Sequence, residues 1–528
     1  MNGRILITGN HPLATDLTRQ YQQRGDEVVL RAKSKDVVET DFSAISEVAI
    51  LADYSQDPLA ADNEAMAMLK RLATVYEPAQ HGGKQLLCHL LLRSQSLLHM
   101  IRLDGFCQEI KSKLEVSAFT MEDQWSRAIA LSLDREPITL QSEKTVHLII
   151  FNMSDVAEQV AINAAHVCHY PNYTQKEHTL RTRITVIDEH AIEKSREWTQ
   201  KYNHLFDNSY YRLVDTGKHP AVIDTLKPMY SDRGDFVDIE WEFVSGSPYN
   251  SLIRRKVELW AESQSQLLTV VFAGKDTERQ LNDALHLPPA VAGQKIPVYV
   301  YMQHDEAYQQ IQHTGSTSHL TPFGMVNRGY DVNVPLLKMA KNVKYIYDRC
   351  YIENDKDWTG RLRFTVDIDE KQKELCWQKE SAVKQTSNIY NAMTIAVKMR
   401  SMGFKEDDWD KFYDLSQEDI ELLAEVEHNR WSVEELILGW RPCTDKEQQE
   451  IAKSIEEHIE KRNRLGDEAV KGEKTLKEVY KKERKAHYDL RAYSELQPDG
   501  TGRPVQVYDR CLSACIPLIA KESKGGGL

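Results

Sequence analysis

The sequence predicts an α/β protein with two doubly wound parallel sheets, followed by a mostly helical C-terminal part. Three observations lead to this fold class. Short apolar runs alternate with amphipathic stretches that are long enough to cross over a parallel sheet. The alternation starts again after about residue 140. Beyond about residue 335 strand-like runs become rare while helical periodicity continues.

The first α/β unit is predicted from five apolar runs with amphipathic segments between them. Leu13–Arg24 and Asn63–Tyr76 have helical periodicity and are predicted as crossover helices. Nearly continuous apolar character is typical of strands that are covered on both faces. The strand predictions are Arg4–Thr8, Glu27–Leu30, Val48–Ala52, Leu86–Leu92 and Leu114–Ala118.

The second unit repeats this pattern, with the helix-like segment Asp155–Cys168 after its first strand. Its strand predictions are Val146–Phe151, Arg181–Asp188, Phe236–Val244, Leu267–Phe272 and Ile296–Tyr301. Helices are then predicted within Pro335–Tyr351 and Cys376–Gly403. The predicted regions are 1–140 for the first unit, 141–335 for the second, 336–410 for a helical connector and 411–528 for a C-terminal domain.

The C-terminal domain contains a densely charged insertion at about 445–484. Ile451, Ile455 and Ile459 recur there at i, i+4 spacing, which predicts one apolar face on an exposed helix or helical hairpin. Acidic and basic residues are mixed, which disfavours a membrane-surface role. The last residues, KESKGGGL, are typical of a flexible tail.

Composition excludes several classes of protein. Apolar residues make up 41% and charged residues 28%, as in globular domains. The net charge of −13 disfavours nucleic-acid binding, and no apolar run approaches the length of a membrane span. Eight scattered cysteines without a CxxC pair predict reduced thiols in a cytoplasmic protein. Cys511 and Cys515 share a predicted helix face, but two thiols alone are an incomplete zinc site.

Each unit carries part of a dinucleotide-binding pattern in the turn after its first strand. Such a turn needs glycines so that the backbone can approach a pyrophosphate at a helix N-terminus. In the first unit Gly9 is in place, but His11 stands where the close-approach glycine belongs. The position at the end of the second strand, where an acidic residue would bind the ribose of NAD, falls near Arg31. An arginine there disfavours NAD and leaves NADP as an alternative.

The second unit has the acidic residue of the dinucleotide-binding pattern but lacks its glycines. Asp188 is well placed at the end of its second strand, whereas the first turn, FNMSD, contains no glycine. Two interpretations follow: both units are Rossmann-like scaffolds that have lost cofactor binding, or Asn152, Ser154 and Asp188 hold an adenine nucleotide or NAD(P).

A resemblance to a known family concerns this second unit. The stretch LLTVVFAGKDTERQLNDALHL, followed by IPVYVYM, resembles the later strands of TrkA-N domains, which are Rossmann-like regulatory units of potassium channels and transporters. Gly274, Asp276, Thr277 and Glu278 match the loop after that family's fourth strand. The resemblance covers roughly residues 145–305 and implies ligand sensing rather than hydride chemistry.

The C-terminal domain resembles the RyR domain, named for the repeats of ryanodine receptors. The first matching block is LAEVEHNRWSVEELILGWRP, and the second is HYDLRAYSEL with VYDRCLSACIPLI. The segment WQKESAVKQTSNIYNAMTIAVKMRSMGF resembles the helical piece that precedes this domain in bacterial TrkA-N and RyR fusion proteins. The charged insertion is longer than the family's usual connection. The resemblance implies recognition of nucleotide-derived ligands.

The residue types of these blocks suit a binding surface. His428 and Trp431 lie one helical turn apart, so an indole can stack on a base beside a hydrogen-bonding imidazole. Alternatively, the tryptophans are core residues and Glu427 pairs with His428 inside the domain. The predicted ligand-binding residues are Glu427, His428, Arg430, Trp431, Trp440, His487, Tyr493 and Arg510.

Function is predicted as ligand sensing because two binding-type modules occur without a nucleophile elbow, a Walker loop or an HExxH motif. One alternative is an NAD(P)-dependent oxidoreductase or nucleotide-processing enzyme that uses Arg31 or Asp188. Another is an interaction scaffold that docks a protein partner through the charged insertion. A homodimer is expected because Rossmann-like regulatory domains often dimerise.

Overall fold

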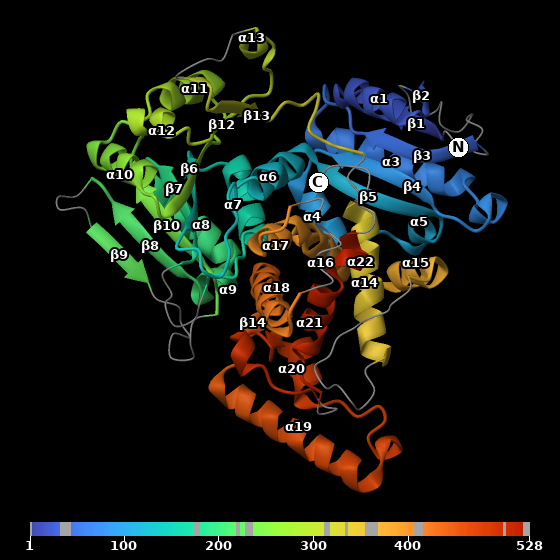
Figure 1. Cartoon of the computed structure of the whole chain (residues 1–528). Coiled ribbons are helices and arrows are strands. Elements are labelled where there is room, and N and C mark those ends of the chain that lie inside the picture. Colours follow the sequence, from blue (N-terminus) through green and yellow to red (C-terminus); the bar gives the residue numbers. More distant parts are fainter. Residues whose placement is uncertain are drawn as a thin grey trace.

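The chain folds into two parallel α/β sheets and a helical C-terminal part, which confirms the predicted fold class (Figure 1). The structure is a computed structural model. It describes residues 3–31, 44–173, 180–217, 222–226, 236–310, 317–332, 336–353, 368–405, 415–499 and 503–520. The first sheet lies at the upper right of Figure 1, the second at the left, and the C-terminal helices beneath and between them.

The first sheet has five parallel strands in the order β2-β1-β3-β4-β5. This is the flavodoxin-like order, whose topological switch point lies between β1 and β3. All five predicted strands are confirmed, with small shifts at their ends. Their bounds are β1 Arg4–Thr8, β2 Glu27–Arg31, β3 Ile45–Leu51, β4 Leu86–Leu92 and β5 Leu114–Thr120.

Helices cover the first sheet unevenly. Apolar residues of α3, α4 and α5 pack in one core with one face of the sheet, and Leu13, Leu17 and Tyr21 of α1 pack on the other. The last helix, α6, instead packs along the first helix of the second unit, so the two units share a core. The bounds are α1 Leu13–Arg24, α3 Pro58–Val75, α4 Gln95–Asp104, α5 Gln108–Lys113 and α6 Met121–Leu131.

The second sheet has the order β13-β12-β11-β6-β7-β10-β8-β9, in which only the β8–β9 pairing is antiparallel. Without β8 and β9, the order is the 3-2-1-4-5-6 arrangement of dinucleotide-binding folds, with its switch point between β6 and β11. The bounds are β6 Thr145–Phe151, β7 Thr182–Asp188, β8 Tyr210–Asp215, β9 Val222–Leu226, β10 Ile239–Ser245, β11 Gln266–Phe272, β12 Val298–Tyr301 and β13 Leu320–Phe323.

The helices of the second unit alternate with these strands. Ser154 caps the N-terminus of α7, because its Oγ accepts a hydrogen bond from the Ala157 amide. Most of α7 is buried between the sheet, α6 and the C-terminal helices. The bounds are α7 Asp155–Val167, α8 Ala191–Lys201, α9 Asn203–Asn208, α10 Ser251–Glu262, α11 Thr277–Leu285, α12 Pro289–Gly293 and α13 Glu306–Gln309.

The described residues of the C-terminal part are mostly helical, with a short parallel pairing of β14 with β15. The predicted helical region Cys376–Gly403 is divided among three helices, with breaks at Ser381 and Thr394. The bounds are α14 Leu336–Glu353, α15 Glu370–Lys379, α16 Ala382–Met393, α17 Ile395–Ser401, α18 Gln417–Ile437, β14 Arg441–Pro442, α19 Asp445–Leu465, α20 Leu476–Arg484, β15 Ala486–His487, α21 Val507–Ala514 and α22 Ile516–Ala520.

The charged insertion forms a helical hairpin of α19 and α20, as predicted (Figure 1). Ile451 and Ile455 are buried and Ile459 packs against them, in a small core that includes Tyr480 of α20. The predicted tail, 521–528, and Pro335 lie outside the described residues. In the described part of the chain, no helix combines the length and the apolar character needed to cross a membrane.

The prediction of reduced thiols is wrong for two of the eight cysteines. Cys350 of α14 and Cys511 of α21 form a disulfide across a sequence separation of 161 residues. Both lie in the core shared by α14, α16, α18 and α21, where the helix packing holds their side chains together. The disulfide also removes Cys511 from any zinc site with Cys515.

Candidate functional site

The switch point of the first sheet is nearly filled. Gly9 has a φ of +109°, and a Cβ there would lie 1.9 Å from the Leu51 carbonyl oxygen, so packing against β3 requires this glycine. His11 is buried, and its Nδ1 accepts a hydrogen bond from the Leu13 amide. The cavity at this point measures about 20 Å³, which holds about one water molecule. Arg31 is exposed on the edge strand, where it bonds to its neighbour's carbonyl.

The switch point of the second sheet brings its three predicted residues together. Asn152 takes a φ of +69°, the left-handed conformation that glycine supplies in dinucleotide-binding turns. Ser154 Oγ caps α7 and donates to the Ala273 carbonyl at 2.5 Å. The Asp188 carboxylate accepts from the Met153 amide and the Lys194 ammonium, each at 2.8 Å. These bonds order the turn after β6.

Asp188 remains ionised in this position. Partial burial opposes its charge, but the bonds from Lys194 and two backbone amides outweigh burial and lower the pKa of the carboxyl. Lys194 was not predicted from the sequence. Its signal is the spacing of six residues after Asp188, which places it on the first turns of α8.

Two predicted tryptophans and a histidine meet in the C-terminal part. We call Trp431, Trp440 and His487 the aromatic cluster. The His487 ring lies 4.9 Å from that of Trp431 and 6.1 Å from that of Trp440, edge-on to both. The imidazole is buried, whereas both indoles are half-buried. Trp431 comes from α18, Trp440 follows the left-handed Gly439, and His487 lies in β15.

Two charged residues that the sequence did not single out border the aromatic cluster. Lys481 Nζ lies 2.7 Å from His487 Nε2 and 5.6 Å from the centre of the Trp440 ring. Burial and Lys481 lower the pKa of His487 to about 3, so its imidazole is neutral. Burial and the nearby Glu434 raise the pKa of Glu435 to about 7. Glu435 is detectable in the sequence because it lies four residues after Trp431 on the same helix.

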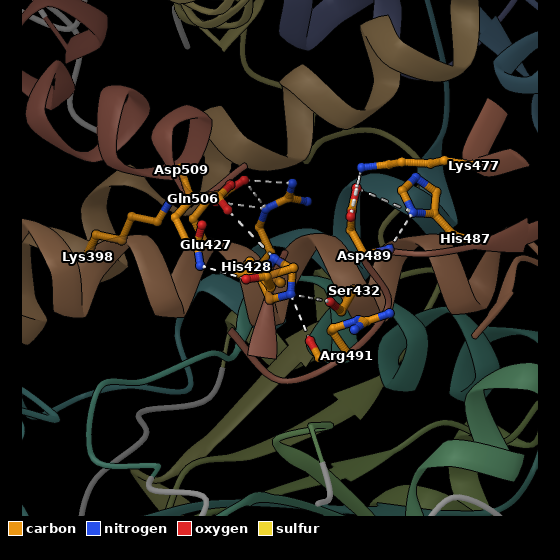
Figure 2. Close-up of polar contacts among 12 residues, drawn as sticks. Lys398, Glu427, His428, Ser432, Lys477, His487, Asp489, Arg491, Gln506 and Asp509 are labelled. Carbon is orange, nitrogen blue, oxygen red and sulfur yellow. Dashed lines mark hydrogen bonds and ion pairs between the residues drawn. The ribbon is translucent and has the colours of Figure 1, made fainter. Parts of the chain in front are cut away.

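His428 connects the aromatic cluster to the following segments (Figure 2). Its Nε2 donates to the Arg491 carbonyl at 2.9 Å, and its Nδ1 lies 3.6 Å from the Asp509 carboxylate. The ring lies 5.5 Å from that of Trp431, as their helical spacing predicts, and 5.8 Å from that of Tyr493. His428 is therefore a bridge between α18, the segment after β15 and α21.

The predicted residues Glu427 and Arg430 belong to a set of charges enclosed beside this cluster. We call Lys398, Glu427, Arg430 and Glu434 the buried ion network; Figure 2 labels Lys398 and Glu427. Lys398 Nζ lies 2.6 Å from Glu427, and Arg430 binds Glu427 at 2.9 Å and Glu434 at 2.6 Å. Burial opposes the charge of Glu427, but Arg430 and Lys398 lower its pKa to about 2. These polar atoms are partnered within the protein.

The remaining predicted residue lies at the edge of this region. Arg510 binds the Glu421 carboxylate, with one nitrogen at 2.6 Å, which joins α21 to α18. The rings of Tyr493, His428, Trp431, His487 and Trp440 thus form a continuous chain of contacts, and Arg510 lies beside Tyr493 at one end of it. Among the described residues no group of three or more His, Cys, Asp or Glu side chains is arranged to hold a metal ion.

No protein-family model, no curated protein and no solved structure matches this chain. The fold therefore defines the class: a protein with two Rossmann-like parallel α/β sheets joined to a helical C-terminal part. The resemblances to TrkA-N and RyR domains stay predictions from the sequence.

Proposed function

We propose that this protein is a ligand sensor in which the aromatic cluster binds the planar base of a nucleotide or a nucleotide-derived molecule. The supporting observation is the pair of half-buried indoles around a neutral imidazole, with the Lys481 ammonium beside them. Stacking of one base on an aromatic side chain contributes about 1–3 kcal/mol. Lys481 supplies a positive charge for a phosphate.

Ligand binding has a direct route to the rest of the protein. Trp431 contacts His428, and His428 contacts both the Arg491 carbonyl and Asp509 of α21. A ligand that reorients Trp431 therefore shifts the packing between α18 and α21. A ligand can change the conformation in this way only if it binds one packing arrangement of α18 and α21 more tightly than the other.

Isothermal titration calorimetry with ATP, NAD, ADP-ribose and cyclic AMP tests the proposal. We expect one of these to bind, and we expect Trp440→Ala and Lys481→Gln each to weaken its binding roughly tenfold or more, in line with the loss of a stacking or charged contact. Trp260→Ala is the matched control, since Trp260 is a partly buried tryptophan on α10. Equal binding by Trp440→Ala and the wild type would contradict the proposal.

The pH dependence of binding provides an independent test. Because the pKa of Glu435 is about 7, its carboxyl gains a negative charge beside the aromatic cluster as the pH rises through 7. Binding of NAD, whose phosphates do not titrate in this range, should weaken between pH 6 and pH 8 by up to about tenfold, the effect of one charge at short range. Glu435→Gln should abolish this dependence.

The second-sheet switch point supports a second candidate, an NAD(P)-dependent or nucleotide-processing enzyme. The supporting observation is the 3-2-1-4-5-6 strand order with Asp188 at the end of β7 and Asn152 at positive φ in the first turn. Turnover screens with NAD and NADP test it, with Asp188→Asn as the site variant. Activity that survives Asp188→Asn would exclude this crevice.

A further inference from the structure

A large open cavity of about 1290 Å³ lies where the three parts of the protein meet. Strands β4 and β5 of the first sheet form one wall, and the other walls include α4, α6, α14 and α16. Apolar side chains that line it include Leu131, Leu337, Ile389 and Met393. Its volume exceeds that of an ordinary small-molecule pocket, which is about 300–1,000 Å³. It shares no lining residue with the aromatic cluster.

Several charged groups along this cavity are paired with neighbours of opposite charge. Arg24 lies 2.9 Å from Glu47, and Glu47 also binds His89 at 2.7 Å. On another wall, Lys341 lies between Glu115 and Glu374, at 2.7 Å and 2.8 Å. Carboxylates on these two walls therefore have basic partners within the protein.

The lining formed by α4 and α6 carries more positive than negative charge. Arg102 and Arg127, which both line the cavity, share the single carboxylate of Asp123. Arg102 makes two hydrogen bonds to Asp123, at 3.1 Å and 2.6 Å, and Arg127 Nε lies 3.0 Å from the same carboxylate. Asp123 itself is fully buried. Two guanidinium groups thus face one carboxylate in a region largely removed from water.

The guanidinium group of Arg127 has unused hydrogen-bond donors among the described residues. Within the described residues, its two terminal nitrogens make no hydrogen bond, and its guanidinium lies over the Tyr390 ring at 5.4 Å. Its side chain is only 11% exposed. A guanidinium that is this enclosed favours a second anionic partner, because water solvates it poorly.

We propose that this cavity binds an amphiphilic organic anion, whose carboxylate or phosphate head contacts Arg127 and Arg102. The apolar body of the ligand lies against Leu131, Ile389 and Met393. The anionic head supplies a second negative charge to the two guanidinium groups, which otherwise share the one carboxylate of Asp123. The apolar lining contacts the rest of the ligand. This ligand site is additional to the one proposed at the aromatic cluster.

Calorimetry with octyl phosphate, octanoate and octanol tests the proposal on the full chain. We expect at least one of the two anions to bind, and the uncharged octanol to bind roughly tenfold or more weakly, because charge-assisted hydrogen bonds to the head are lost. The two anions show whether the head is a phosphate or a carboxylate. Absence of binding by both anions, or equal binding of octanol, would overturn the proposal.

Two variants locate the site. Arg127→Met removes the free donors, and Ala128→Phe places a ring in the cavity from the next residue of α6, which lines the cavity and is exposed there. Both should weaken binding of the anion roughly tenfold or more. Arg255→Met on α10, an exposed arginine paired with Glu258, should leave it unchanged. Ala128→Phe keeps every charge, so unchanged binding by this variant would refute the site even if Arg127→Met fails to fold.

Discussion

Helices α18 and α19 are alike in sequence character and opposite in environment. Each has 21 residues, many of them charged, and each begins with a capping box, at Ser416 and at Thr444. Yet α18 encloses Glu427, Arg430 and Glu434 in the buried ion network, whereas most charges of α19 face water. The difference teaches that charge content does not decide whether a helix is solvated. The partners supplied by other segments decide it.

The largest expected effect comes from removing a carboxylate on α18. Glu427→Leu leaves Lys398 and Arg430 without their shared partner, and breaking a buried pair in this way costs about 3–5 kcal/mol. The matched change on α19 is Glu457→Leu, since Glu457 is exposed and only loosely paired with Lys453. It should change stability by less than about 0.5 kcal/mol. Urea denaturation measures both, and equal effects would abolish the contrast between the helices.

Lowering the pH should reduce the stability that Glu427 contributes to the fold. The pKa of Glu427 is lowered to about 2, so its ionisation stabilises the fold above the unfolded value of 4.5 and this contribution is lost as the pH falls towards 2. The stability difference between wild type and Glu427→Gln should therefore shrink below pH 4.5, by an amount on the order of 3 kcal/mol in total. Denaturation curves at pH 6, 4 and 3 measure it. A difference that stays constant with pH would contradict this assignment.

The disulfide between Cys350 and Cys511 holds α21 beside α14, and its removal should have the next largest effect on stability. Its reduction should lower stability by about 2–4 kcal/mol, since a long loop regains its freedom in the unfolded chain. Cys350→Ala should make stability insensitive to the reductant. Cys515→Ala, in the same core, should leave that sensitivity intact. Thermal melts with and without dithiothreitol distinguish the two.

The smallest expected effects come from the two caps. Ser416→Ala and Thr444→Ala each remove a side-chain bond to a helix amide, at a cost of about 1 kcal/mol. Because α18 is part of the main packing, the first should lower global stability. The second should mainly speed amide exchange within α19 and α20. Hydrogen exchange followed by mass spectrometry separates the outcomes, and identical exchange patterns would show that the hairpin is not an independent unit.

The sequence predicted those strands whose apolar character is nearly continuous, such as β4, β6 and β11. It missed β8, β9 and β13. Strand β8 is half-buried near the sheet edge, and β13 has only four residues, one of them Pro322. Such strands depend on their neighbours rather than on their own pattern. The disulfide was missed because spacing along the chain does not reveal that α14 and α21 lie side by side.

The same reasoning explains how much of the candidate site was predictable. His428 and Trp431 were expected together because helix periodicity fixes their spacing. Glu427 and Arg430 were predicted as ligand-binding residues, but their partner Lys398 comes from another helix 29 residues away. Lys481 comes from the charged insertion, where nothing in the sequence distinguishes it from its exposed neighbours.

The pairing of β14 with β15 means that the hairpin leaves and re-enters the body of the protein at one place. A protease that cuts the turn between α19 and α20 would produce two fragments, one containing Cys350 and the other Cys511. These fragments would migrate as one band on a non-reducing gel and as two after reduction. The nicked protein would also elute as a single particle in size-exclusion chromatography, because the cut lies beyond β14 and β15, which hold the two ends of the hairpin together.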